Sequence, residues 1–140
     1  MSKPNLKAEF VSEWADGEFL FALKAGQIEE LEKICDEGIG KIAFRCFSGT
    51  DFTYKHVRET IRLALIGGGM PAVEAERKAK TYIDGCPIDH QGDPFSNLKT
   101  ARKVLQAVYF GWEDLPPLGE AEAGETPATE PTSETSEQPS

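Results

Sequence analysis

The sequence predicts an α+β fold that is mostly helical: an N-terminal β-hairpin, about five short helices, and then an acidic tail. Three observations predict this order. Alternating apolar residues flank a turn signal at Asp16-Gly17, apolar residues recur at helical spacing from residue 27 onward, and residues 116–140 contain no basic or aromatic residue. We therefore expect one globular domain over residues 1–115 and a disordered acidic tail over residues 116–140.

The hairpin has the strongest local signal. Asp16-Gly17 suits the positive backbone angles of a two-residue turn, which would pair Ala15 with Glu18 and place Trp14 opposite Phe19. One face of the ribbon then carries six side chains, five of them apolar: Phe10, Ser12, Trp14, Phe19, Phe21 and Leu23. Because a two-stranded ribbon is not stable alone, we expect helices to cover this face.

Three amphipathic segments follow, over residues 27–36, 39–47 and 53–66. In the first, Glu29 and Glu30 suit the first helical turn, and Gly38 is expected to end the helix. The predicted inward stripes are Ile28, Leu31 and Cys35; then Ile39, Ile42, Ala43, Cys46 and Phe47; then Val57, Ile61, Ala64 and Leu65. The third segment is expected to turn four charged side chains to solvent: Lys55, Arg58, Glu59 and Arg62.

Two further helices complete the predicted domain. Pro71 suits the first turn of a helix that runs to about residue 84, with Ala75, Ala79, Tyr82 and Ile83 facing inward. A connector over residues 85–92 precedes the last helix, for which Asp93 is the expected N-cap and Pro94 the first helical residue. That helix should end near residues 110–111 and bury Leu98, Ala101, Leu105 and Val108.

Charge excludes some classes of function. The net charge of -9 divides into -6 on residues 116–140 and -3 on the rest, from 15 basic and 18 acidic residues. Such a chain lacks the clustered positive field that nucleic acid requires, and no apolar run reaches the length of a membrane span. We expect neither nucleic acid nor membrane as a partner. Three cysteines and no secretory signal favour a reducing cytoplasm.

Two features are candidate partner-binding sites. Gly67, Gly68 and Gly69, followed by Met70, suit a helix C-cap with a tight turn, or a bare backbone surface against which a partner packs. A nucleotide-binding loop is disfavoured because these glycines end a helix and no Lys-Ser or Lys-Thr follows. Basic residues also recur on one helical face, which is either a solvated face or a docking strip for an acidic segment: Lys55, Arg58 and Arg62.

No residue pattern predicts chemistry. Cys86, Asp89, His90 and Asp93 lie in the connector, but their spacing matches neither a zinc signature nor an EF-hand. His56 has no nucleophile or acid at a catalytic spacing and is expected to be exposed. Phe110 and Trp112 are expected to close the core. We therefore predict no enzyme activity, no cofactor and no metal.

The sequence also resembles a known family. The run from Val57 to Met70, with its Ile-Arg-Leu-Ala-Leu-Ile-Gly-Gly-Gly segment, resembles small proteins of gene transfer agents and related prophages. The turn at residues 14–18, Gly38-Ile39-Gly40, and the helix from Ala101 to Gly111 are similar and occur in the same order. The resemblance spans nearly the whole predicted domain and none of the tail.

Members of this family are described as tail tube proteins or as tail assembly chaperones. The resemblance implies a tail morphogenesis role, no cofactor and a tape measure protein as partner, with other tail proteins and copies of the chain as further possible partners. A tube subunit generally needs a large β-sandwich, and the sequence offers one hairpin. We therefore favour a tail assembly chaperone, with a structural tail tube protein retained in the particle as the alternative.

Overall fold

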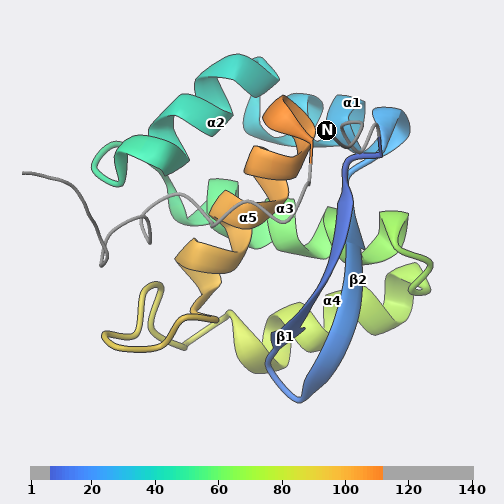
Figure 1. The fold of residues 1–140 in the computed structure, drawn as a ribbon, viewed down its shortest axis with the longest axis vertical. Helices are drawn as coiled ribbons and strands as arrows, with labels where there is room; N and C mark the ends of the chain where they lie inside the picture. The colour runs from blue at the N-terminus through green and yellow to red at the C-terminus, as the bar shows by residue number, and fades with distance from the viewer. Residues whose placement is uncertain (1–6, 112–140) are drawn as a thin grey trace, which may run out of the picture.

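The computed structural model describes residues 7–111, so the predicted tail and Trp112 lie outside the described residues. This part of the chain confirms the predicted fold class, a two-stranded antiparallel hairpin followed by five helices (Figure 1). The elements are β1 (Glu9–Trp14), β2 (Gly17–Ala22), α1 (Ala25–Cys35), α2 (Ile39–Ser48), α3 (Tyr54–Gly67), α4 (Ala72–Tyr82) and α5 (Asn97–Phe110).

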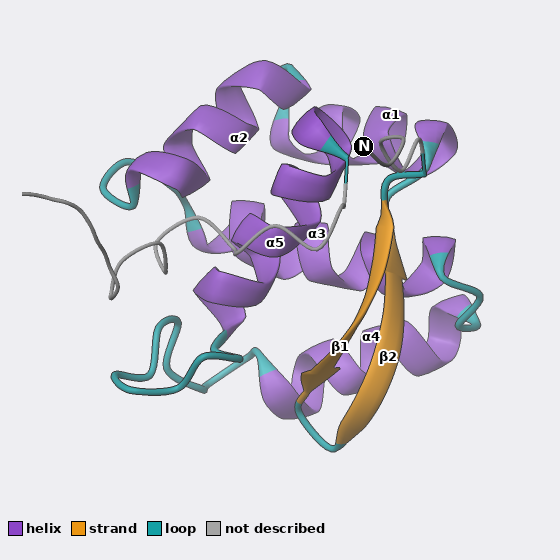
Figure 2. Ribbon diagram, in the orientation of Figure 1, coloured by secondary structure: helices purple, strands orange, loops and turns teal. Residues whose placement is uncertain are grey.

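Helix α3 lies at the centre and packs against β2, α1, α4 and α5 (Figure 2). Helix α5 also packs against α2 and β1, so the last helix closes the structure against the first strand. The predicted inward stripe of α3 is confirmed, because Val57, Ile61, Ala64 and Leu65 are all buried. The apolar face of the hairpin completes the core, with Phe10, Trp14, Phe21 and Leu23 buried.

The hairpin uses the predicted face in a different register. Trp14 pairs with Gly17 and Ser12 with Phe19, so the turn consists of Ala15 and Asp16 rather than Asp16 and Gly17. Ala15 adopts the left-handed conformation that the turn requires, at φ 56°. Gly17 instead lies inside β2, where the Phe19 ring covers the space that a side chain would fill. A shift of two residues keeps every side chain on its predicted face.

Several helix ends differ from the prediction. Helix α1 starts at Ala25, so Glu29 and Glu30 lie beyond its first turn, and it ends at Asp36 in the left-handed conformation before Gly38 is reached. Helix α5 starts at Asn97 with Ser96 as its N-cap. Asp93 does accept a backbone N–H, but from Phe95, two residues on, in a local turn that precedes the helix.

Candidate functional site

Two residues of the predicted basic strip, Arg58 and Arg62, belong to an ionic cluster between α3 and α4. Arg58 donates hydrogen bonds to Asp84 (Nε to Oδ1, 2.8 Å), Glu76 (Nη2 to Oε2, 3.0 Å) and Glu59 (Nη1 to Oε2, 2.8 Å). Arg62 binds the other Glu59 oxygen at 2.5 Å. The prediction that Arg58, Glu59 and Arg62 face solvent is therefore wrong, since Glu59 is only 7% exposed. An amphipathic pattern places such residues opposite the core, and here α4 covers that side.

Of the strip, only Lys55 is exposed. Its ammonium lies 3.5 Å from the Ile34 carbonyl oxygen, at the end of α1. The hydrogen bonds from Arg58 are the main reason that the pKa of Glu76 is lowered from its usual value of 4.5. The cluster consequently stabilises the α3–α4 contact, and the partner-binding role predicted for Lys55, Arg58 and Arg62 remains a prediction.

The glycine segment ends α3 as the capping interpretation predicts. Gly69 has a φ of 111° and donates its N–H to the Ile66 carbonyl, and Met70 donates to Leu65, which together form a Schellman motif. A side chain on Gly67 or Gly68 would collide with the backbone carbonyl of Ala22 or Leu20 in β2. The bare backbone of these two glycines therefore contacts the hairpin of the same chain, while Gly69 is exposed.

His56 was predicted to be exposed, but it is buried, at 3% exposure. Its Nδ1 accepts the Thr53 N–H at 2.9 Å and the Thr53 hydroxyl oxygen accepts the His56 N–H, so the two residues form the capping box of α3. Because Nδ1 is an acceptor, Nε2 carries the proton that is donated to Glu37 at 2.8 Å. Arg45 binds the other Glu37 oxygen at 2.9 Å. The imidazole thus orders α3 and the end of α1.

The neighbouring thiol does not add a nucleophile to this cluster. Cys35 lines the same hollow as Glu37 and His56, but burial raises its pKa to about 11. A thiol with such a pKa is almost entirely protonated at neutral pH and is a poor nucleophile. Within residues 7–111, no group of three or more His, Cys, Asp or Glu side chains is arranged to hold a metal ion. In the same range, none of the helices is long and apolar enough to cross a bilayer.

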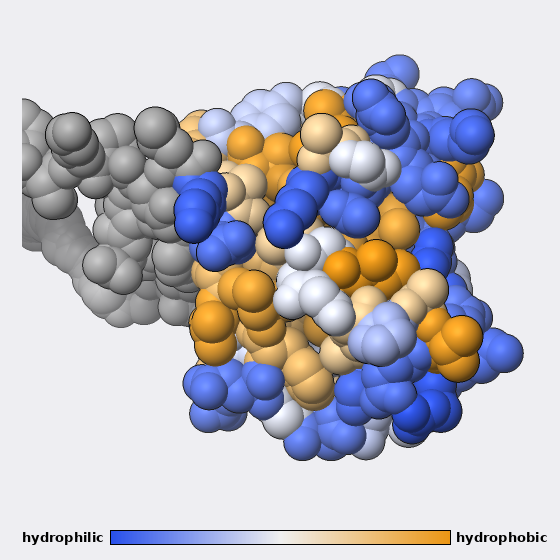
Figure 3. Space-filling view, turned by 90° about the vertical axis from the view of Figure 1, so that its right-hand side faces the viewer, coloured by the Kyte–Doolittle hydropathy of each residue, from blue (hydrophilic) through white to orange (hydrophobic). Residues whose placement is uncertain are grey.

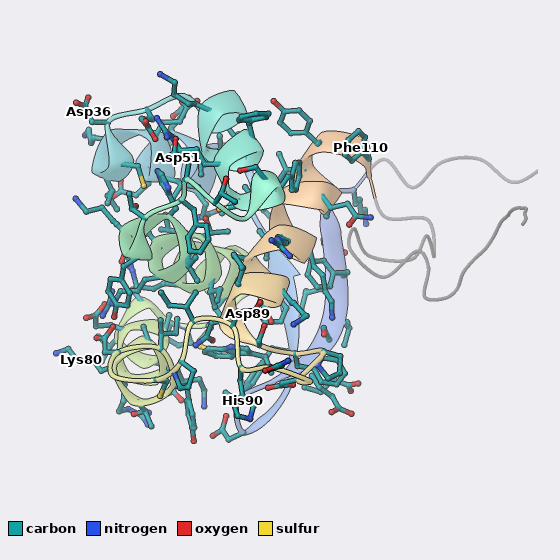
Figure 4. The ribbon with its side chains drawn as sticks, turned by 90° about the vertical axis from the view of Figure 1, so that its left-hand side faces the viewer. Asp36, Asp51, Lys80, Asp89, His90 and Phe110 are labelled. Carbon is teal, nitrogen blue, oxygen red and sulfur yellow. The ribbon has the colours of Figure 1, made fainter. Side chains whose placement is uncertain are left out.

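Three aromatic side chains of α2 and α5 are exposed. Phe44 is 70% exposed on α2, and Tyr109 and Phe110 are 49% and 58% exposed at the end of α5. Phe110 therefore does not close the core as predicted, and Figure 4 shows it at the end of α5, where the described chain stops. Figure 3 shows apolar patches between hydrophilic ones on the face turned to the viewer. The sequence held a signal for these residues, because Phe44, Tyr109 and Phe110 all lie off the predicted inward stripes.

The comparison with protein families decides what kind of protein carries this surface. A family model described as phage tail tube protein, GTA-gp10, matches residues 7–111. The chain belongs to this family. The match covers every helix and strand described above and agrees with the resemblance seen in the sequence. Searches of curated proteins and of solved structures found no match to the chain. The GTA-gp10 family places the protein among phage tail proteins of the gene transfer agent type.

Proposed function

We propose that this GTA-gp10 family protein is a tail assembly chaperone that binds the tape measure protein during tail morphogenesis. The observation that carries the proposal is the small size of the sheet within residues 7–111, which is too small to form a tube wall. Residues 7–111 contain one two-stranded hairpin, and the outer edge of its β2 strand already packs against Gly67 and Gly68. A closed β-structure requires strands with free edges that pair from subunit to subunit.

The surface of the helical body supports a chaperone role. A long apolar helix is prone to aggregate unless its stripe is covered, and exposed aromatic side chains are the residue types that make such contacts energetically strong. Phe44, Tyr109 and Phe110 offer these contacts on rigid helices. The net charge of -9 would keep the complex soluble in the host cytoplasm while tube subunits assemble.

The alternative is a structural tail tube protein that is retained in the particle. It is favoured by the description of the family itself, which names a tail tube protein. On this alternative the partners are tube subunits, including further copies of the chain, and association would need the exposed parts of the hairpin. Neither function requires a cofactor or catalytic residues.

Two measurements separate these functions. The full-length chain, carrying an affinity tag, is co-expressed with the tape measure protein of the same tail gene cluster and recovered in mild salt. We expect a stable complex; recovery of the tagged chain alone would contradict the chaperone proposal. Mass spectrometry of purified particles should then lack the protein, whereas its presence in amounts comparable to the tube subunit would establish the structural alternative.

A further inference from the structure

The two helices that carry the exposed aromatic residues also differ from the rest of the chain in charge. Helix α2 contains two basic residues and α5 contains three, and neither helix contains an acidic residue, in a protein whose net charge is -9. We define the α2–α5 face by the side chains that these helices present together: Lys41, Phe44, Phe47, Arg102, Tyr109 and Phe110. An aromatic and basic face on an acidic protein is complementary to an apolar and acidic partner.

The aromatic part of this face is continuous from one helix to the other. The Phe47 and Tyr109 rings meet edge to face with centroids 6.2 Å apart, and the Tyr109 and Phe110 rings lie 5.8 Å apart. The Tyr109 hydroxyl reaches across α2 to Gly40, where a side chain would come within 3.0 Å of it. Phe44 lies one turn of α2 from both Gly40 and Phe47, so its exposed ring extends the same surface.

Basic side chains lie at both ends of the aromatic surface. Tyr109 reaches the start of α2, whereas Arg102 donates its Nε–H to the Cys46 carbonyl near the end of α2 at 2.8 Å, so the two helices run antiparallel. Arg102 and Tyr109 are seven residues apart, or about 10 Å along a helix. Neither Lys41 nor Arg102 forms an ion pair with an acidic residue in the described part of the chain, unlike Arg45 with Glu37 and Lys99 with Asp89.

We propose that the α2–α5 face binds an amphipathic helix of the tape measure protein. That partner helix would carry the apolar stripe, flanked by acidic residues about two turns apart. Two helices satisfy their own backbone hydrogen bonds, so this face offers side chains and no strand edge, which suits a helix rather than an extended segment. The proposal rests on the chaperone function and assigns a surface to it.

Other occupants fit this chemistry less well. A second copy of the chain would bring Lys41 and Arg102 against the same cations of its partner. Nucleic acid needs more phosphate contacts than the two basic side chains of this face can supply. The chain's own acidic residues 116–140 have the right charge, but they contain no aromatic residue and no run of apolar residues that could form a helical stripe.

The test measures the affinity of full-length variants for the tape measure protein at low and high salt. Phe44→Ser should weaken binding about tenfold or more, because it truncates a central aromatic contact, and Lys41→Glu should weaken it while reducing its salt dependence. Matched controls on α4 are Val73→Ser, which alters an apolar side chain that is even more exposed than Phe44, and Lys80→Glu. Both controls should bind within about twofold of the wild-type protein.

The outcomes distinguish this inference from the proposed function. If the wild-type protein binds no tape measure protein, the chaperone function itself fails. If the wild-type protein binds and Phe44→Ser and Lys41→Glu bind equally well, the function stands and the α2–α5 face is the wrong surface. A full-length variant with all six Glu of residues 116–140 changed to Gln should keep its affinity. A tenfold gain would show that this segment covers the face, and would overturn the choice of occupant.

Discussion

At the scale of single residues, a close backbone approach between α3 and β2 depends on two missing side chains. Gly67 and Gly68 let the end of α3 lie directly on the carbonyl oxygens of Ala22 and Leu20. A glycine inside a helix weakens it by about 1 kcal/mol relative to alanine, so its use at the last turn of the central helix needs an offsetting gain. That gain is the tight contact between α3 and the hairpin.

Two glycine-to-alanine substitutions should therefore have opposite effects on the free energy of unfolding. Gly67→Ala places a methyl group against the Ala22 carbonyl and should destabilise the protein by about 2–3 kcal/mol or more. Gly26→Ala, in the first turn of α1, meets no atom within 4 Å and should stabilise it by about 0.5–1 kcal/mol. Urea denaturation of both variants measures the difference. Equal effects would mean that α3 does not approach β2 so closely.

At the scale of elements, α3 and α4 are joined by charges as well as by apolar contacts. Arg58 alone bonds three carboxylates: Glu59 on α3, Glu76 on α4, and Asp84 two residues beyond the end of α4. Its side chain is 15% exposed, so the attraction is less screened than on an open surface. Removing Arg58 takes one partner from the buried Glu59, which keeps its contact with Arg62, and one each from Glu76 and Asp84, whose side chains are 41% and 36% exposed. The loss of several contacts, one of them to a buried carboxylate, destabilises more than the loss of one exposed pair.

Arg58→Ala should accordingly destabilise the protein by about 2–3 kcal/mol. The matched control is Arg77→Ala on α4, which removes an arginine paired with Glu74 but 66% exposed, and should change stability by no more than about 0.5 kcal/mol. Chemical denaturation at neutral pH gives both values. If the two variants lose equal stability, the α3–α4 cluster contributes no more than a surface pair.

The same cluster predicts a dependence on pH. The pKa of Glu76 is lowered in the folded protein, so its contribution to stability is fully present above the unfolded value near 4.5 and is lost as the pH falls through the lower, folded value. Glu76→Gln should therefore be less stable than wild type at pH 7, and this difference should shrink as the pH falls below 4.5. Urea midpoints measured across this range test it; a constant difference would exclude the linkage.

Elements were more predictable from the sequence than the contacts between them. The stripe of α3 and the faces of the hairpin follow from apolar spacing, which depends on local geometry alone. The hairpin register did not follow from local geometry. The prediction placed Gly17 in the turn, whereas Gly17 lies in β2, where the Phe19 ring packs over it. The burial of Glu59 depends on α4, and that of His56 on its contact with Glu37. Both partners lie outside the α3 segment whose apolar spacing gave the prediction.

At the scale of the whole molecule, one side chain links the first strand to the start of the last helix. The Trp14 Nε1–H donates to the Asn97 Oδ1 at 2.8 Å across 83 residues, and this hydrogen bond is buried. The Asn97 amide donates in turn to the Tyr82 carbonyl at 3.1 Å. Asn97, at the start of α5, thus joins the hairpin to the end of α4, so these three parts are expected to fold together.

Asn97→Ala should destabilise the protein by about 2 kcal/mol or more, because it leaves the buried Trp14 N–H without its acceptor. Alanine is a better helix former than asparagine at the first position of α5, so helix propensity would work against this loss and cannot explain it.

The matched control, Lys99→Ala, removes a part-exposed ion pair with Asp89 two residues along α5 and should change stability by about 0.5 kcal/mol. Thermal and urea unfolding, followed by circular dichroism, provide the comparison. A single cooperative transition with a lower midpoint is expected for Asn97→Ala, since the hairpin cannot persist without the helices that cover it. Separate unfolding of the hairpin and the helices would show that this link does not hold the domain together.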